Sequence, residues 1–254
     1  MFTSLIVRPI FNLLVFIYAI IPGHNFGVAL ILFTIVIRLL MWPLVKKQLR
    51  HTKMMRKFQP DLRRIKQEAK GDKRKEQTMM MELYKEHNYN PLGTIPILIV
   101  QFIILIGLYS GLSKVIRDPN QIVHFAYPAL QNLDWMKHLA GNIKAFDNTL
   151  FGLVDLSRTA IGNKGTYLPA LALVIGSAGV QFLTSRQLMP VDKEARKLRN
   201  IMKDAGSGKQ ADQYEVNAAI GRSTQYIIPF MVFIFTVSLA AALSLYWFVG
   251  GVVA

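Results

Sequence analysis

The chain has 254 residues, 52% of them hydrophobic, yet Lys and Arg outnumber Asp and Glu by 30 to 15. An ordinary soluble domain rarely combines these properties, so they indicate apolar membrane helices separated by basic loops. No cysteine is present, which excludes disulfides and thiolate chemistry. The histidine spacing fits no helical metal site, and no phosphate-binding or nucleophile-elbow motif occurs. We therefore expect no enzyme, no catalytic residue, no cofactor and no metal.

The N-terminal segment 1–25 is apolar and ends at Pro22-Gly23. Arg8 and Asn12 are one helical turn apart and share one face. A signal peptide and an additional span remain alternatives, but a polar face favours an amphipathic helix that lies in the outer membrane interface.

The apolar run 26–45 has about the length of one bilayer crossing, roughly 20 residues, and it contains Arg38. A permanent cation at this depth costs about 2.5–3.5 kcal/mol on insertion scales. One explanation is that Arg38 snorkels to the interface. The other is that it faces a polar cavity. Because Lys46 lies about 12 Å further along the helix, beyond the reach of a guanidinium, the sequence favours the cavity.

Segment 46–91 is predicted to be a helical hairpin, with apolar residues at helical spacing in both arms and a turn at Gly71-Asp72. Pro60 is expected to disturb a continuous helix. Five of the 11 methionines lie here. They form either the core between the arms or an adaptable surface for diverse partners. The predicted recruitment surface consists of Lys53, Met54, Arg56, Lys57, Met79, Met80 and Tyr84.

Basic residues are concentrated in two regions. Lys and Arg number 14 in 46–87 and 8 in 186–222, against 6 in 114–164. Since cytoplasmic loops carry an excess of Lys and Arg, we place the first two regions in the cytoplasm and the third outside. The sequence thus predicts an all-α multi-pass protein of a bacterial-type cell membrane. Its expected segments are the outer interfacial helix 1–25, the five spans 26–45, 92–113, 166–185, 225–239 and 240–254, the cytoplasmic hairpin 46–91, the extracytoplasmic loop 114–165 with short interfacial helices, and the cytoplasmic loop 186–224, which carries a basic helix (191–202) and a flexible linker (206–210).

Several spans carry polar side chains. Each alone is commonly a hydrogen-bonding group between helices. Together with Arg38 they predict a hydrophilic groove open to the cytoplasm, because five helices are few for enclosing a complete pore. The predicted groove residues are Arg38, Thr34, Gln101, Ser177, Gln181, Gln187 and Tyr246.

Four stretches in the first half carry a more specific signal. They are Pro9-Ile-Phe-Asn-Leu-Leu, Thr34-Ile-Val-Ile-Arg38-Leu-Leu-Met-Trp-Pro43, Met81-Glu-Leu-Tyr84 with Asn90-Pro91-Leu92-Gly93, and Ile95-Pro-Ile-Leu-Ile-Val-Gln101. In this order they resemble the interfacial helix, first core helix, cytoplasmic hairpin and second core helix of the YidC/Oxa/Alb family of insertases. The resemblance is weaker over 166–254, where it rests on residues 187–190, 228–229 and 245–246.

This resemblance implies a membrane protein insertase and chaperone that moves nascent chains from the cytoplasm into the bilayer, alone or with a Sec-type translocon. The family's groove arginine, threonine and glutamine correspond to Arg38, Thr34 and Gln101. The implied partners are nascent membrane proteins, ribosomes, membrane lipids, the Sec translocon and components of the signal recognition particle pathway.

The chain departs from the family pattern in two places. Ala240-Ala-Ala242 replaces the Pro-Ser-Gly turn that often precedes the last span. The family's last helix usually continues into a basic cytoplasmic tail, whereas this sequence stops at Ala254. We therefore expect either a truncated chain or ribosome contact through the two basic cytoplasmic regions.

Two other function classes compete with the insertase. A small anion channel or transporter would use Arg38 as its anion site, but residues 26–33 offer no polar path to the outer side. A membrane-tethered RNA-binding module would use the basic hairpin on phosphates, but it leaves Arg38 without a role.

The predicted topology is testable because the chain has no native cysteine. Single cysteines at Lys75 and Ser207 should react only with thiol reagents that reach the cytoplasm, and one at Asn142 only with reagents applied outside. Labelling of position 142 from the cytoplasmic side would contradict the assignment.

Overall fold

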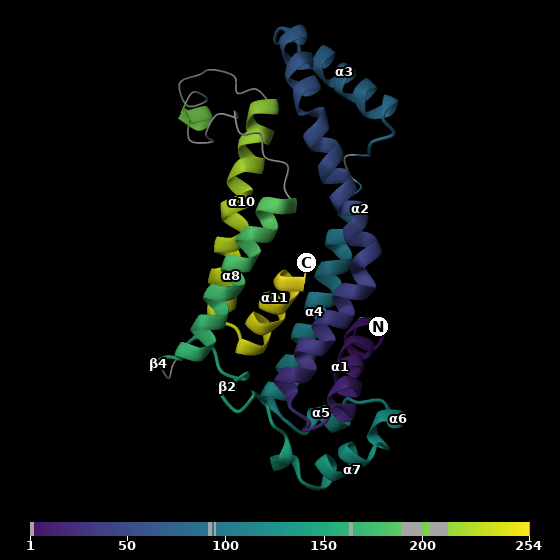
Figure 1. Cartoon of the computed structure of the whole chain (residues 1–254), viewed down its shortest axis with the longest axis vertical. Helices are drawn as coiled ribbons and strands as arrows, with labels where there is room; N and C mark the ends of the chain where they lie inside the picture. Colours follow the sequence, from purple (N-terminus) through teal and green to yellow (C-terminus); the bar gives the residue numbers. More distant parts are fainter. Residues whose placement is uncertain are drawn as a thin grey trace. The chain divides into compact units, whose positions relative to one another are not determined.

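The computed structural model describes residues 3–90, 93, 95–162, 165–188, 200–203 and 213–253. Within these ranges the chain is mostly helical (Figure 1). The predicted linker 206–210 and most of the predicted basic helix 191–202 lie outside the described residues.

The chain divides into two compact units. The first unit contains Met1–Trp42, Leu98–Gln181 and Met231–Ala254. The second unit contains Pro43–Ile97 and Phe182–Phe230.

Seven helices of 13 or more residues carry most of the described chain, together with a π-helical start, η1 (Thr3–Val7). They are α1 (Arg8–Ile20), α2 (Phe26–Ala69), α3 (Lys73–Glu86), α4 (Ile95–Arg117), α8 (Leu168–Leu188), α10 (Gln213–Val237) and α11 (Ala241–Val253). The shorter helices are α5 (Gln121–His124), α6 (Pro128–Gln131), α7 (Asp134–Gly141) and the 3₁₀ turn η2 (Ile143–Ala145). The core of the first unit consists of almost fully buried side chains, including Phe11, Leu14, Tyr18, Leu30, Phe33, Leu108, Leu112 and Leu243.

Four described helices are long and apolar enough to cross a bilayer: Thr3–Ile20, Phe26–Ala69, Ile95–Arg117 and Leu168–Gln187. Ser223–Val237 and Ala241–Val253 are apolar but shorter. This set differs from the five expected spans. It includes the N-terminal helix Thr3–Ile20, and it does not include the helices that correspond to the expected spans 225–239 and 240–254. With 13 residues, α11 extends about 20 Å, less than the roughly 30 Å of a hydrocarbon core.

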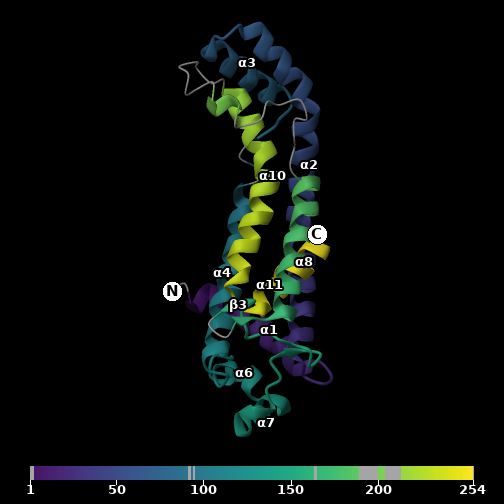
Figure 2. The same ribbon diagram turned by 90° about the vertical axis from the view of Figure 1, so that its left-hand side faces the viewer.

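Helix α2 is continuous over 44 residues, although Pro43 and Pro60 lie inside it (Figure 2). The expected disturbance at Pro60 does not end the helix. Proline removes one backbone hydrogen bond and crowds the preceding turn. Burial of Phe58 and Leu62 on either side of Pro60 compensates for part of that cost.

The expectation of an all-α chain needs a correction in the segment 114–165. This segment and the residue that follows it form two antiparallel β-hairpins, which pair β1 (Thr149–Leu150) with β2 (Val154–Asp155) and β3 (Ile161–Gly162) with β4 (Gly165–Thr166). Short polar loops favour such turns over continued helix.

The same segment supports the start of α11. The backbone N–H groups of Ala241 and Ala242 donate to the carbonyl oxygens of Arg158 (2.8 Å) and Leu156 (3.0 Å). The first N–H groups of any helix lack partners within the helix. Tertiary hydrogen bonds therefore fix this helix start, where the local sequence Ala240-Ala-Ala242 provides no turn signal.

Helix α1 presents its polar face to protein. The Asn12 side chain is 3% exposed; its Nδ2 donates to the carbonyl of Arg8 at 2.7 Å, and its Oδ1 accepts from the backbone N–H of Tyr127. On α4, a Cβ added to Gly111 would lie 2.7 Å from Cδ2 of Phe11. The missing side chain at Gly111 thus lets α1 pack directly on α4, as small residues do in membrane proteins.

We predict that Asn12→Ala lowers the free energy of unfolding by about 1–3 kcal/mol, because it removes a buried side chain that pairs with the backbone of Arg8 and Tyr127. Asn132→Ala is the matched control, since Asn132 is exposed. Denaturant unfolding of both variants in detergent measures the difference. Equal stabilities would contradict the role of Asn12.

Candidate functional site

Helix α2 separates its side chains around Arg38 into two faces. Thr34 and Met41 are 0% and 6% exposed, whereas Leu39 and Leu40 are 63% and 65% exposed. Arg38 shares the first face, because residues three and four apart lie together on a helix. Its half-buried side chain is thus directed into the first unit.

The Arg38 guanidinium lies against α11. A Cβ built on Gly250 would lie only 2.6 Å from Nη2 and 3.0 Å from Nε of Arg38. Tyr246, one turn earlier on α11 and 5% exposed, is a neighbour of the same guanidinium. Within the described part of the chain, Arg38 forms no ion pair or hydrogen bond, so its charge is not neutralised there.

The other predicted groove residues have varied surroundings. Thr34 and Ser177 are fully buried, and each hydroxyl donates to a carbonyl of its own helix, that of Leu30 (2.6 Å) or Val174 (2.9 Å). Such back-bonding satisfies the hydroxyls locally. They therefore offer little free hydrogen-bonding capacity in this state.

The predicted glutamines are distributed over both units. Gln101 and Gln181 are half-buried in the first unit. Gln187 is exposed and belongs to the second unit, where its backbone carbonyl accepts a hydrogen bond from Nη2 of Arg56 at 2.7 Å. The structure thus associates Gln187 with the basic hairpin.

Sequence reasoning missed two residues of α11, of which Gly250 lies against Arg38. Gly250 permits the close approach of the guanidinium. Ser244 is 0% exposed, and its Oγ has no hydrogen-bond partner within the described residues. The Gly250-Gly251 pair was a possible signal, since small residues mark close packing in membrane helices.

In the second unit, α2 and α3 are joined by a short turn. Lys70 and Gly71 have positive φ angles of 47° and 91°. Oδ1 of Asp72 then accepts hydrogen bonds from the backbone N–H groups of Arg74 (2.9 Å) and Lys75 (3.1 Å). Asp72 is therefore a side-chain N-cap for α3.

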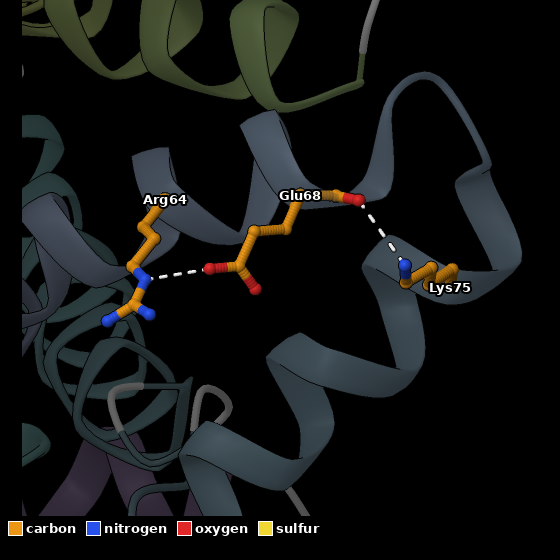
Figure 3. Close-up of polar contacts among 3 residues, drawn as sticks. All are labelled: Arg64, Glu68 and Lys75. Atoms are coloured by element: carbon orange, nitrogen blue, oxygen red, sulfur yellow. Dashed lines mark hydrogen bonds and ion pairs between the residues drawn. The ribbon is translucent and has the colours of Figure 1, made fainter.

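Two exposed polar contacts lie beside this turn (Figure 3). Nε of Arg64 pairs with Oε1 of Glu68 at 2.7 Å, and Nζ of Lys75 donates to the Glu68 carbonyl at 3.3 Å. Exposed pairs of this kind add little stability. The hairpin therefore depends on its apolar contacts.

Those contacts form an aromatic cluster around Phe58, which is 4% exposed. Its ring centroid lies 5.0 Å from His87, 5.4 Å from Tyr89 and 6.3 Å from Tyr84. Burial raises the pKa of the Tyr84 hydroxyl. Burial and the neighbouring Tyr84 raise the pKa of Tyr89. Both side chains are therefore neutral at physiological pH and suit this apolar cluster.

The predicted recruitment residues differ in exposure. Lys53, Arg56 and Lys57 are exposed, while Met54, Met79, Met80 and Tyr84 are half-buried. Met81, which the sequence analysis did not select, is 55% exposed. The exposed surface of the hairpin is thus basic, and Met81 adds an exposed apolar side chain to it.

The described residues contain no group of three or more His, Asp or Glu side chains arranged to hold a metal ion.

Residues 16–254 match the family described as the 60Kd inner membrane protein. The chain is 30% identical over 252 residues to MisCA of Bacillus subtilis (strain 168), which is named a membrane protein insertase. That alignment covers 96% of this chain and 73% of MisCA.

Proteins named membrane protein insertase YidC match over shorter regions. The protein from Nitratidesulfovibrio vulgaris (strain DSM 19637 / Miyazaki F) is 34% identical over 139 residues, which are 54% of this chain and 25% of the relative. The protein from Clostridium tetani (strain Massachusetts / E88) is 41% identical over 94 residues, 37% of this chain and 43% of the relative.

The apolar helices and these matches define a multi-pass protein of the bacterial cell membrane. The chain belongs to the 60Kd inner membrane protein family, in agreement with its resemblance to YidC-type proteins.

We predict that Gly250→Ala displaces the Arg38 guanidinium, because the new methyl group occupies its position. Gly179→Ala is the control, since a Cβ there meets open space. The ¹⁵Nε–¹H signal of Arg38, assigned by its loss in Arg38→Lys, should shift only in Gly250→Ala. An unshifted signal would contradict the contact.

Proposed function

We propose that this protein is a membrane protein insertase that moves nascent membrane proteins from the cytoplasm into the bilayer. The observation that carries the proposal is the half-buried cation of Arg38, held between α2 and α11 without an acidic partner among the described residues. The names of the relatives support the same activity.

The proposed topology has five spans, 26–45, 92–113, 166–185, 225–239 and 240–254, with 1–25 as an outer interfacial helix. The loop 114–165 lies outside, and 46–91 and 186–224 lie in the cytoplasm. The contacts of Asn12 with the backbone of residues 125–127 support placing the first helix with the outer loop.

In the proposed mechanism, Arg38 keeps a groove hydrated and open to the cytoplasm. The groove lowers the cost of bringing a polar segment into the membrane, which is high when the segment is surrounded by lipid. Arg38 also attracts acidic residues of the incoming chain. Thr34, Gln101, Ser177, Gln181 and Tyr246, all of the first unit, are the proposed polar lining.

The hairpin is the proposed recruitment surface. Lys53, Arg56 and Lys57 attract ribosomal phosphates or acidic partners, and the methionines adapt to apolar segments. The proposed partners are ribosomes, nascent membrane proteins, lipids, a Sec-type translocon and components of the signal recognition particle pathway.

An anion channel fits the first unit less well. On the outer side of Thr34, α2 presents Phe26, Ala29, Leu30 and Phe33, all 0–3% exposed. A tightly packed apolar layer of this kind leaves no hydrated path for an ion.

We predict that Arg38→Leu lowers the insertion yield of a substrate with an acidic translocated tail by about tenfold, the equivalent of about 1.4 kcal/mol. Arg38→Lys should retain much of the activity, because the groove requires a positive charge more than the planar, bidentate geometry of a guanidinium group. Thr34→Ala and Gln101→Ala should have milder effects. Insertion is measured in cells depleted of the native insertase.

A matched substrate with a neutral tail is the control for this prediction. Full activity of Arg38→Leu on both tails would refute the charged groove.

We predict that replacing Lys53 and Lys57 by Gln weakens ribosome association and reduces its log–log salt slope by about two, roughly one per phosphate contact. Deletion of 50–88 should abolish most of the salt-dependent binding. The same change at Lys137 and Lys144, exposed lysines of the outer loop, is the control. Binding that is insensitive to both the deletion and salt would rule out this role.

A further inference from the structure

The turn between β1 and β2 exposes two large apolar side chains. Leu153 is 77% exposed, the highest value among the large hydrophobic residues described, and Phe151 is 67% exposed. Both belong to the extramembrane segment 114–165, where polar residues are the usual choice for a tight turn.

The backbone of this turn disfavours a bulky residue at position 151. The turn closes through a hydrogen bond from the Leu153 N–H to the Leu150 carbonyl at 3.0 Å. Its two central residues, Phe151 and Gly152, have positive φ angles of 53° and 71°. Turns with this property favour Asn, Asp or Gly at the first central position. Phe151 thus combines an unfavourable backbone conformation with a largely exposed apolar side chain.

The base of the hairpin is fixed to the beginning of α2. A Cβ added to Gly27 would lie 2.7 Å from the Cα of Leu150. The Phe26 N–H donates to the Asp147 carbonyl at 3.2 Å, and Nδ2 of Asn25 donates to the Asp147 carboxylate at 2.7 Å. The turn is therefore held at the level where an apolar membrane helix begins.

A second exposed apolar surface follows the β3–β4 hairpin in the chain. Strand β4 leads directly into α8 (Figure 1). Leu168, the first residue of α8, is 72% exposed, and Ile175, seven residues later on the same face, is 58% exposed. On a helix long enough to span the bilayer, this face meets lipid. The exposed apolar face of α8 therefore extends to the end of the β3–β4 hairpin.

We propose that Phe151 and Leu153 insert into the outer interfacial layer of the bilayer and anchor the loop 114–165 to lipid. The occupant of this apolar surface is the membrane itself, because the hairpin base is fixed to the start of one membrane helix and the second hairpin continues into another. The anchor does not require insertase activity.

Spin labels measure this depth directly, because the chain has no native cysteine. The full-length chain carries a label at Leu153→Cys or, as the control, at Lys144→Cys, an exposed polar position in the same loop. Both are reconstituted in vesicles of phosphatidylcholine and phosphatidylglycerol. The label at 153 should collide more with oxygen, which dissolves in lipid, than with a water-soluble nickel chelate, and the label at 144 should show the reverse.

A label at 153 that is as accessible to nickel as the label at 144 would overturn the proposal. A label shielded from both reagents would also overturn it, because a second copy or another protein would then cover the turn. Phe151→Asn suits the positive φ and preserves the turn. This variant should retain the unfolding temperature in detergent. It should also make the label at 153 more accessible to the nickel chelate, because the anchor is weakened. An unchanged depth of the label would show that Phe151 is not part of the anchor.

Discussion

The half-buried guanidinium of Arg38 is the constraint on which the arrangement of the first unit depends. A permanent cation in an apolar helix is costly, and within the described residues no carboxylate neutralises it. The structure accommodates the guanidinium by packing it against Gly250 and near Tyr246, and the outward side of α2 remains apolar. An uncompensated charge of this kind favours water and anionic groups as neighbours, which is the physical basis of the proposed groove.

The position of α11 opposite Arg38 depends in turn on the segment 114–165. Carbonyl groups of Leu156 and Arg158 satisfy the first N–H groups of α11, and Asp147 fixes the same segment to the start of α2. The segment thus links the N-terminal ends of the two helices that hold the guanidinium. At the start of α11 this segment provides tertiary hydrogen bonds in place of a local turn signal.

The sequence predicted the features that depend on local patterns. Family membership and the multi-pass membrane character follow from apolar runs, charge distribution and short motifs. The contact between Arg38 and Gly250 was not predictable, because it depends on the packing of helices more than 200 residues apart in the chain. The burial of Asn12 was missed for the same reason. The β-hairpins were missed because strands of two residues produce no periodicity.

Water access to the proposed groove is the most direct test of the central claim. A single cysteine at Gln101, half-buried in α4, is exposed to a charged, membrane-impermeant maleimide in oriented vesicles. The account predicts reaction when the reagent is added on the cytoplasmic side and none when it is added outside. Reaction only from the outer side, or from neither side, would contradict a hydrated groove open to the cytoplasm.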